Sequence, residues 1–334
     1  MKNTGRRALL ARSLIATASV LAGFSTPTLS GAQTLTVRWG ESLAPNHPQV
    51  MMAERVAREV KDKTGGRIDI QVFPNSQLGS GKEMVEMVAS GGLHMVTEGA
   101  GALAAFLPSM SLIEAPYLWR DAAHMAKLPA TPYFAKLNDD LVAKRGMRMV
   151  GVTYYGKRHL TSGSKAVRSP ADMAGFKLRV PPVDVYSAMA ESWGARATPV
   201  AFGELYLSLS MHLVDGQENP LPTIQSAKLN EVQKYLVLTG HIITPRVVVA
   251  NEAFLKALSP SDRTVLNAAL ASAIAWQDKE LQSQEAMLIH TLKTQGMTVI
   301  EPDISLWSKP VLDSVPKKFE GRWGKGMFEA LRAL

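Results

Sequence analysis

The sequence predicts an α/β fold, and three observations support that prediction. Strand and helix patterns alternate over residues 35–97, an order that favours parallel strands with connecting helices. A similar alternation resumes near Met147. The chain has 334 residues, of which 46% are hydrophobic and 20% are charged, so it can bury a sizeable core in two domains or in one large one.

The first alternation opens with Leu35, Val37 and Trp39, which occupy every second position as in a half-buried strand. The elements expected after it are a helix around 53–60, a strand over 68–72, a helix around 84–88 and a strand over 93–97. A pair of glycines follows each helix, as is usual where helices end. This β-α-β-α-β order is typical of a parallel sheet.

The second alternation follows Met147. Its expected elements are strands over 149–154 and 177–180, a helix over 183–193, and short strands over 198–200 and 212–215. A long helix is expected from Pro260 to about Lys293, because Ser259 is a good cap and apolar residues then recur at helical spacing. No Ser/Gly-rich linker separates the two halves, which suggests two closely coupled lobes with several chain crossings.

Residues 1–32 have the pattern of an export signal. A basic stretch precedes an apolar run over 14–24, and small residues at 30–32 suit a cleavage site. The run is shorter than the ~20 residues of a spanning helix, so a membrane anchor is the less favoured alternative. Arg6 and Arg7 leave twin-arginine export open beside the general secretory route. We therefore expect a periplasmic protein.

Charge and cysteine content narrow the possible partners. The formal net charge is +8, and four of the positive charges lie in the predicted export signal. The remaining mild positive balance gives no basis for nucleic-acid binding and suits a small anionic ligand. The chain contains no cysteine, which excludes disulfides and a cysteine nucleophile.

Several motifs resemble catalytic or cofactor signatures but are incomplete. The segment GAGALA at 99–104 matches the dinucleotide fingerprint, yet Pro108 cuts short the helix that this site requires. The segment GSGK at 79–82 lacks the other residues of a phosphate loop. The seven histidines are scattered without metal-ligand spacing, and no G-x-S-x-G nucleophile motif occurs. We therefore expect neither an enzyme nor a cofactor.

A set of longer motifs in a fixed order is more informative. The second half contains GKRHLTSGS (156–164), SPADMAGFKLRVP (169–181), GARATPVAFGELYLSLSMHLVDGQENP (194–220) and EVQKYLVLTGH (231–241). The first half contains NHP (46–48), KTGGRIDIQVFPNSQLG (63–79) and EAPYLW (114–119). Together they closely resemble the solute-binding proteins of tripartite ATP-independent periplasmic (TRAP) transporters, of the DctP type. The resemblance covers nearly all of the chain after residue 32.

This resemblance implies a two-lobed periplasmic binding protein fold, with a ligand cleft between the lobes and a long bracing helix. Lobe one would comprise 34–155 plus 245–284, and lobe two 156–244 plus 285–334. The implied function is capture of a small organic carboxylate, in a cleft that closes on it, for uptake driven by an ion gradient. The expected partners are that ligand and the TRAP permease subunits, and we expect a monomer that binds no nucleic acid.

The resemblance also implies which residues hold the carboxylate. The family uses the arginine of the KLRVP segment, here Arg179, whose planar guanidinium can pair two carboxylate oxygens at once. Asn219 matches the asparagine beside that carboxylate, with a role in the Pro220 turn as the alternative. Arg158 matches a second arginine of the site; its alternative is a packing salt bridge to lobe one. Phe202 matches an apolar wall of the cleft.

The rest of the ligand is less constrained. Sialate-binding members carry a glutamate and an arginine where this chain has Gly99 and Ala102, so sialic acid is disfavoured. Glu98 either accepts hydrogen bonds from ligand hydroxyls or is solvated. His47 and Gln49 lie in a loop that borders the cleft in this family, and such polar groups favour a hydroxylated or sugar acid.

Other ligands and functions stay open at this point. An aromatic or keto acid is possible, since Trp39, Tyr154, Tyr155 and Trp193 are candidates for the pocket wall. The alternatives to transport are a binding protein that feeds a chemoreceptor or sensor kinase, and a secreted enzyme on the same fold.

Overall fold

The computed structural model describes residues 34–334, which form one compact unit. The predicted export signal at 1–32 lies outside the described residues. None of the helices in the described part of the chain is long and apolar enough to cross a membrane.

One mixed sheet contains every strand of the described residues. In chain order these are β1 (Leu35–Glu41), β2 (Ile68–Phe73), β3 (Met95–Gly99), β4 (Met147–Ser162), β5 (Lys177–Val180), β6 (Arg196–Pro199), β7 (Gly216–Pro220), β8 (Tyr235–Asn251) and β9 (Thr298–Ile300). Their spatial order is β2-β1-β3-β8-β4-β7-β5-β6, with β9 beside β8. The α/β prediction is confirmed, and the parallel pairs β1–β2, β1–β3 and β5–β6 lie where the alternating patterns predicted them.

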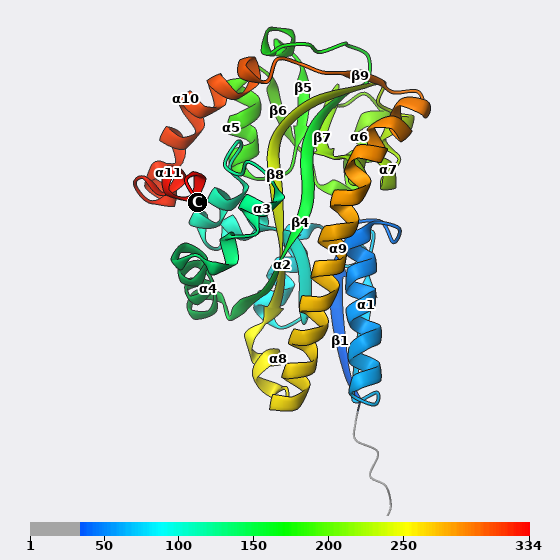
Figure 1. Cartoon of the computed structure of the whole chain (residues 1–334), viewed down its shortest axis with the longest axis vertical. Helices are drawn as coiled ribbons and strands as arrows, with labels where there is room; N and C mark the ends of the chain where they lie inside the picture. The colour runs from blue at the N-terminus through cyan, green and yellow to red at the C-terminus, as the bar shows by residue number, and fades with distance from the viewer. Residues whose placement is uncertain (1–33) are drawn as a thin grey trace, which may run out of the picture. The chain divides into compact units, whose positions relative to one another are not determined.

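The helices cover this sheet and carry most of the connections (Figure 1). Their bounds are α1 (Pro48–Lys63), α2 (Gly81–Ser90), α3 (Ala122–Met125), α4 (Pro132–Arg145), α5 (Asp184–Ser192), α6 (Leu205–Ser210), α7 (Leu221–Ser226), α8 (Glu252–Ala257), α9 (Pro260–Thr294), α10 (Ile304–Trp323) and α11 (Met327–Arg332). Short 3-10 helices also occur, among them η1 (Ala100–Ala105) and η2 (Pro108–Glu114).

Two long strands run through the middle of the sheet. β4 and β8 pair antiparallel along their length, β8 also pairs with β3, and β4 also pairs with β7. The two halves of the sequence pattern are therefore joined by continuous strands. The predicted lobe boundaries at 155/156 and 244/245 fall inside β4 and β8, and the division into lobes at these points stays a prediction.

The helix α9 confirms the predicted long helix almost to the residue. Its N-terminal part packs Leu266, Ala269 and Leu270 into one hydrophobic cluster with β1, α1 and β2. Its C-terminal part packs Leu288 and Leu292 into a different cluster, which includes residues of α6 and α7. One helix thus braces two cores, and Figure 1 shows it running lengthwise beside α1.

α9 also completes the hydrogen bonding of β4 where that strand is irregular. The register between β4 and β8 shifts between Tyr154 and Gly156, which leaves backbone groups without a strand partner. The Tyr154 N–H donates to Asp278 at 2.8 Å, and the Gln277 amide donates to the Tyr154 carbonyl at 2.7 Å. The Lys157 N–H donates to Glu285 at 2.8 Å. The helix therefore holds this irregular segment in place.

Two local expectations can be compared directly with the structure. The glycine-rich segment before α2 is a capped helix start, with Ser80 and Glu83 in a capping box. The short strand predicted over 212–215 is wrong, because His212 has a φ of 55° and the segment forms a turn and bends. A left-handed residue cannot continue a strand, so β7 starts only at Gly216.

We predict that Gly216→Ala lowers the free energy of unfolding by about 3 kcal/mol, as overpacking does. A Cβ at this position would lie 2.1 Å from the Thr161 carbonyl oxygen and 2.7 Å from the Phe176 ring, and a backbone atom cannot move aside. Gly321→Ala is the control, since that exposed helical site is open; it should stabilise by roughly 0.5–1 kcal/mol. Urea unfolding monitored by circular dichroism measures both, and a Gly216→Ala protein as stable as wild type would contradict the close packing of β7.

Candidate functional site

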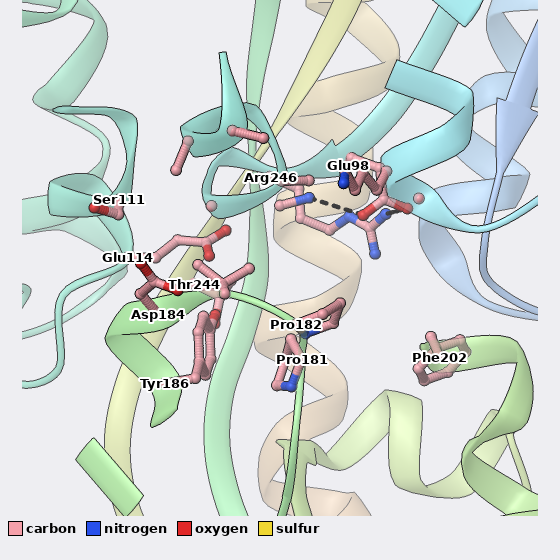
Figure 2. A pocket seen from close by; sticks show the side chains of 18 of the residues that line it. Glu98, Ser111, Glu114, Pro181, Pro182, Asp184, Tyr186, Phe202, Thr244 and Arg246 are labelled. Carbon is pink, nitrogen blue, oxygen red and sulfur yellow. Dashed lines mark hydrogen bonds and ion pairs between the residues drawn. The ribbon is translucent and has the colours of Figure 1, made fainter. Parts of the chain in front are cut away.

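A cavity of about 380 Å³ lies beside the central strands, within the size range of small-molecule sites. Five of the predicted ligand residues line it: Glu98, Arg158, Arg179, Phe202 and Asn219. They come from β3, β4, β5, the turn before α6, and β7. Figure 2 shows part of this wall, with Phe202 on the side opposite Glu114 and Tyr186.

Arg158 is held by a carboxylate from the neighbouring strand. Its guanidinium forms a two-point ion pair with Glu218, whose second contact measures 2.7 Å, and lies 5.1 Å from the centre of the Tyr186 ring. Glu218 also contacts the His241 ring at 2.9 Å. Burial alone raises the pKa of Glu218, but Arg158 and His241 outweigh it and hold this pKa below its ordinary value. Arg158 therefore forms a salt bridge, but its partner on β7 belongs to the segment predicted as lobe two and not to lobe one as the alternative required, and Arg158 also lines the cavity.

A second buried arginine, Arg246 of β8, also forms an ion pair with a carboxylate. It lies 3.2 Å from Glu98 and donates to the Thr97 carbonyl at 2.6 Å, and Figure 2 marks the ion pair. Glu98 also accepts a hydrogen bond of 2.6 Å from Ser42. Glu98 thus lines the cavity as one member of an ion pair rather than as a solvated side chain.

Arg179 differs from both. It is 2% exposed, yet no ion pair within residues 34–334 includes it. Its Nε and Nη2 donate to one backbone acceptor, the Val200 carbonyl, at 2.9 and 2.6 Å. Burial lowers the pKa of Arg179 to about 10, because no nearby carboxylate fully offsets the lost hydration. Arg179 is therefore a buried cation without an ion-pair partner among residues 34–334.

Asn219, near the end of β7, lines the same cavity as Arg179. Its amide donates to Gln217 at 2.5 Å, and its carbonyl oxygen accepts from Arg158 at 3.2 Å. The side chain does not cap the helix that follows Pro220. Because β5 and β7 are parallel, Arg179 and Asn219 lie toward the same edge of the sheet, where ligands of α/β proteins commonly bind.

His47 and Gln49 lie behind the cavity wall rather than in it. His47 is the N-cap of α1 and contacts Thr223 at 3.3 Å, and Thr223 in turn donates to the Tyr155 hydroxyl at 2.7 Å. Gln49 donates to Glu41 at 3.3 Å. Both side chains are fully buried, so in this arrangement they support Tyr155 and Glu41 and do not reach the cavity.

Comparison with known proteins identifies the family. Residues 39–320 match the DctP family model, described as bacterial extracellular solute-binding protein, family 7. The chain belongs to this family. The resemblance seen in the sequence motifs is thereby confirmed, and the members named below are binding proteins.

Similar proteins include two bacterial binding proteins and one solved structure. The 2,3-diketo-L-gulonate-binding periplasmic protein of Escherichia coli is 32% identical over 283 residues, covering 84% of each chain. The sialic acid-binding periplasmic protein of Vibrio cholerae is 29% identical over 311 residues, covering 92% of this chain and 96% of the other. A TRAP periplasmic solute-binding protein from Polaromonas sp. JS666, bound to D-erythronate, superposes with a TM-score of 0.85 at 32% identity, covering 90% of this chain and 99% of that one. The two-lobed fold predicted for this family member is confirmed.

Several cavity residues of this family member escaped the sequence analysis. Arg246, Thr244 and Tyr186 line the wall, as does Glu114. Of the four aromatic candidates, Tyr155 alone is among the lining residues. Glu114 opens the EAPYLW segment that helped to identify the family, but nothing in that segment indicates a direction for its side chain.

Two buried carboxyl groups beside the ion pairs are hard to ionise. Burial raises the pKa of Glu114 to about 7 and that of Glu41, which lies behind the wall, to about 8. Arg246 lowers the pKa of both, but less than burial raises it. Both groups therefore hold a proton over part of the neutral range, and the wall carries less negative charge than its composition suggests.

We predict that Glu41→Gln stabilises the protein increasingly as the pH rises from 5 to 7. The folded-state pKa of Glu41, about 8, exceeds its ordinary value of 4.5, so folded chains keep a proton that unfolded chains lose. Wild-type stability from this group is present below pH 4.5 and is lost as the pH rises toward 8. The amide that replaces the carboxyl group does not titrate, so the stability difference should grow by up to ~2–3 kcal/mol over these two pH units.

Chemical unfolding at pH 5, 6 and 7 measures this difference. Glu83→Gln is the matched control, because that exposed carboxylate has its pKa lowered by hydrogen bonds from Ser80 and is ionised throughout. Its effect should not change with pH over this range. A pH-independent effect of Glu41→Gln would mean that Glu41 is ionised in the folded protein.

Proposed function

We propose that this protein captures a small hydroxylated monocarboxylate in the periplasm and delivers it to the membrane subunits of a TRAP transporter. One observation carries the proposal. Five cationic side chains line the cavity: Lys82, Arg158, Arg179, Arg246 and Arg322. Among the described residues, all of these except Arg179 lie within 4.0 Å of a carboxylate.

A carboxylate of the ligand would be the ion-pair partner that Arg179 does not have among the described residues. A carboxylate that enters a closed cavity loses its water, and this costs several kcal/mol unless a matched charge replaces it. The guanidinium fork of Arg179 supplies that charge, and Asn219 and Arg158, which line the same cavity, offer further donors. One cation without an ion-pair partner can pair with one anionic group, so a ligand with a single carboxylate would balance the charge of the cavity wall.

The chemistry of the relatives supports a hydroxylated ligand. The proteins described above bind 2,3-diketo-L-gulonate, sialic acid or D-erythronate, and each of these acids combines one carboxylate with several oxygen substituents. The polar wall of Glu98, Arg246 and Tyr186 suits such groups. None of these relatives is named as a sensor or an enzyme, and we infer binding without catalysis, by a monomer that takes no nucleic acid. Export through residues 1–32 belongs to the same proposal.

We predict that Arg179→Ala weakens ligand binding by roughly 30- to 5000-fold, the range expected when one member of a buried charged pair is removed. Arg179→Lys should keep the charge but lose the fork, and should still weaken binding about tenfold or more. A thermal-shift panel of sugar acids, including D-erythronate, selects the ligand, since binding to the folded state alone raises stability. Isothermal titration calorimetry with that acid then compares the variants.

Arg196→Ala is the control, because Arg196 is exposed on β6, the strand next to Arg179. It should bind like wild type. Arg158→Ala is a poor comparison, since it leaves Glu218 buried without its main partner and destabilises the fold. If folded Arg179→Ala binds within about threefold of wild type, the carboxylate is held elsewhere and the proposed site is wrong.

A further inference from the structure

Among the described residues, three polar side chains in the cavity wall have a buried atom without a hydrogen-bond partner. Two of them are Glu114, at the end of η2, and Thr244, in the middle of β8. Each residue is 2% exposed, and within the described chain Oε1 of Glu114 and the Thr244 hydroxyl are both buried and unbonded. Nε of Arg246, another lining residue, is in the same state. Leaving buried polar groups unpaired costs free energy, so such a cluster in one cavity indicates a ligand contact.

These groups are gathered on one part of the wall. Figure 2 shows Glu114, Thr244 and Tyr186 together on the side of the cavity opposite Phe202. Gly101 and Tyr186 lie near the Glu114 carboxyl group and both lower its pKa. Arg158 from β4 and Arg246 from β8 face the same carboxyl group. The cluster lies apart from Phe202.

Two glycines leave space for the carboxyl group of Glu114. A Cβ at Gly99 would lie 2.5 Å from one Glu114 oxygen, and a Cβ at Gly101 would lie 2.6 Å from the other. Neither glycine has a positive φ, so their conformation does not require glycine. The space that they leave is occupied by the Glu114 carboxyl group, which fixes its position in the wall.

The open groups match a hydroxyl group better than other ligand chemistry. A hydroxyl both donates and accepts, as does the Thr244 side chain. Burial raises the pKa of Glu114 to about 7, so this group accepts when ionised and also donates when protonated. A second ligand carboxylate would repel Glu114 and Glu98, and an apolar chain would leave the open atoms unpaired.

We infer that Glu114 and Thr244, flanked by Tyr186 and Arg246, form a subsite for a ligand hydroxyl group and exclude dicarboxylates. This inference rests on the proposed function, because it assumes that a carboxylate is bound at Arg179. It assigns discrimination among organic acids to residues other than those that hold the shared carboxylate.

The test uses three acids with the same four-carbon chain: D-erythronate, butanoate and succinate. Calorimetry, with displacement titrations for weak ligands, should show wild type binding erythronate most tightly. Thr244→Val removes the hydroxyl and keeps the shape, so it should weaken erythronate about tenfold and leave butanoate within about twofold. Thr244→Ser, which retains the hydroxyl, should restore most of the erythronate affinity.

Glu114→Gln removes the negative charge at nearly constant size. The ratio of the succinate to the erythronate dissociation constant should fall at least about tenfold, because the repulsion is gone. If wild type binds none of these acids and no other sugar acid, the proposed function fails and the subsite fails with it. If wild type binds erythronate but Thr244→Val and Glu114→Gln weaken all ligands equally, the subsite alone is overturned. Thermal unfolding of each variant confirms that it is folded.

Discussion

The site depends on one constraint: a guanidinium is buried without a carboxylate to balance it. Arg179 donates to the Val200 carbonyl, and the hydration that its charge loses on burial is offset only in part by the nearby Glu218. Within residues 34–334, the other cations of the cavity wall each lie beside a carboxylate, from Arg158 with Glu218 to Arg246 with Glu98. This difference is the reason why we propose Arg179 as the position of the ligand carboxylate.

The central strands explain how residues far apart in the sequence meet around that position. β4 supplies Arg158, and β8 supplies Arg246 and Thr244. β4 pairs with β7 and β8, and β8 pairs with β3 and β4, so these two long strands connect the two halves of the sheet. The shorter β5 and β7 add Arg179 and Asn219 from the same edge. α9 then secures the irregular part of β4 through Asp278 and Glu285. The strands thus position the charged side chains of the cavity wall, and η1, η2 and the segment that follows β5 complete the wall.

Local patterns in the sequence predicted much of this fold, but not its long-range pairing. Alternating residues predicted β1, and a cap with periodic apolar residues predicted α9. β8 was not predicted, because Gly240 and Pro245 interrupt it and its residues are buried on both faces, which removes the alternation. The short strand expected over 212–215 was wrong because strand propensity does not reveal a left-handed residue such as His212. In the site, Arg179 followed from its motif, whereas Arg246 stands in an apolar run where only tertiary structure shows what it faces.

The division between shared and specific contacts follows from the same electrostatics. The acids named for the relatives described above each present a carboxylate, and we propose that Arg179, a buried cation without an ion-pair partner among the described residues, binds that shared group here. The groups that contact the rest of the ligand must instead distinguish one acid from another. A buried carboxyl group at a pH near its pKa does so by accepting hydrogen bonds from hydroxyl groups and, when ionised, by repelling anions. Glu114 has this character because burial opposes its ionisation, while Glu98 is paired directly with Arg246. A wall that contains both kinds of carboxyl group can favour one anionic end of a ligand and disfavour a second.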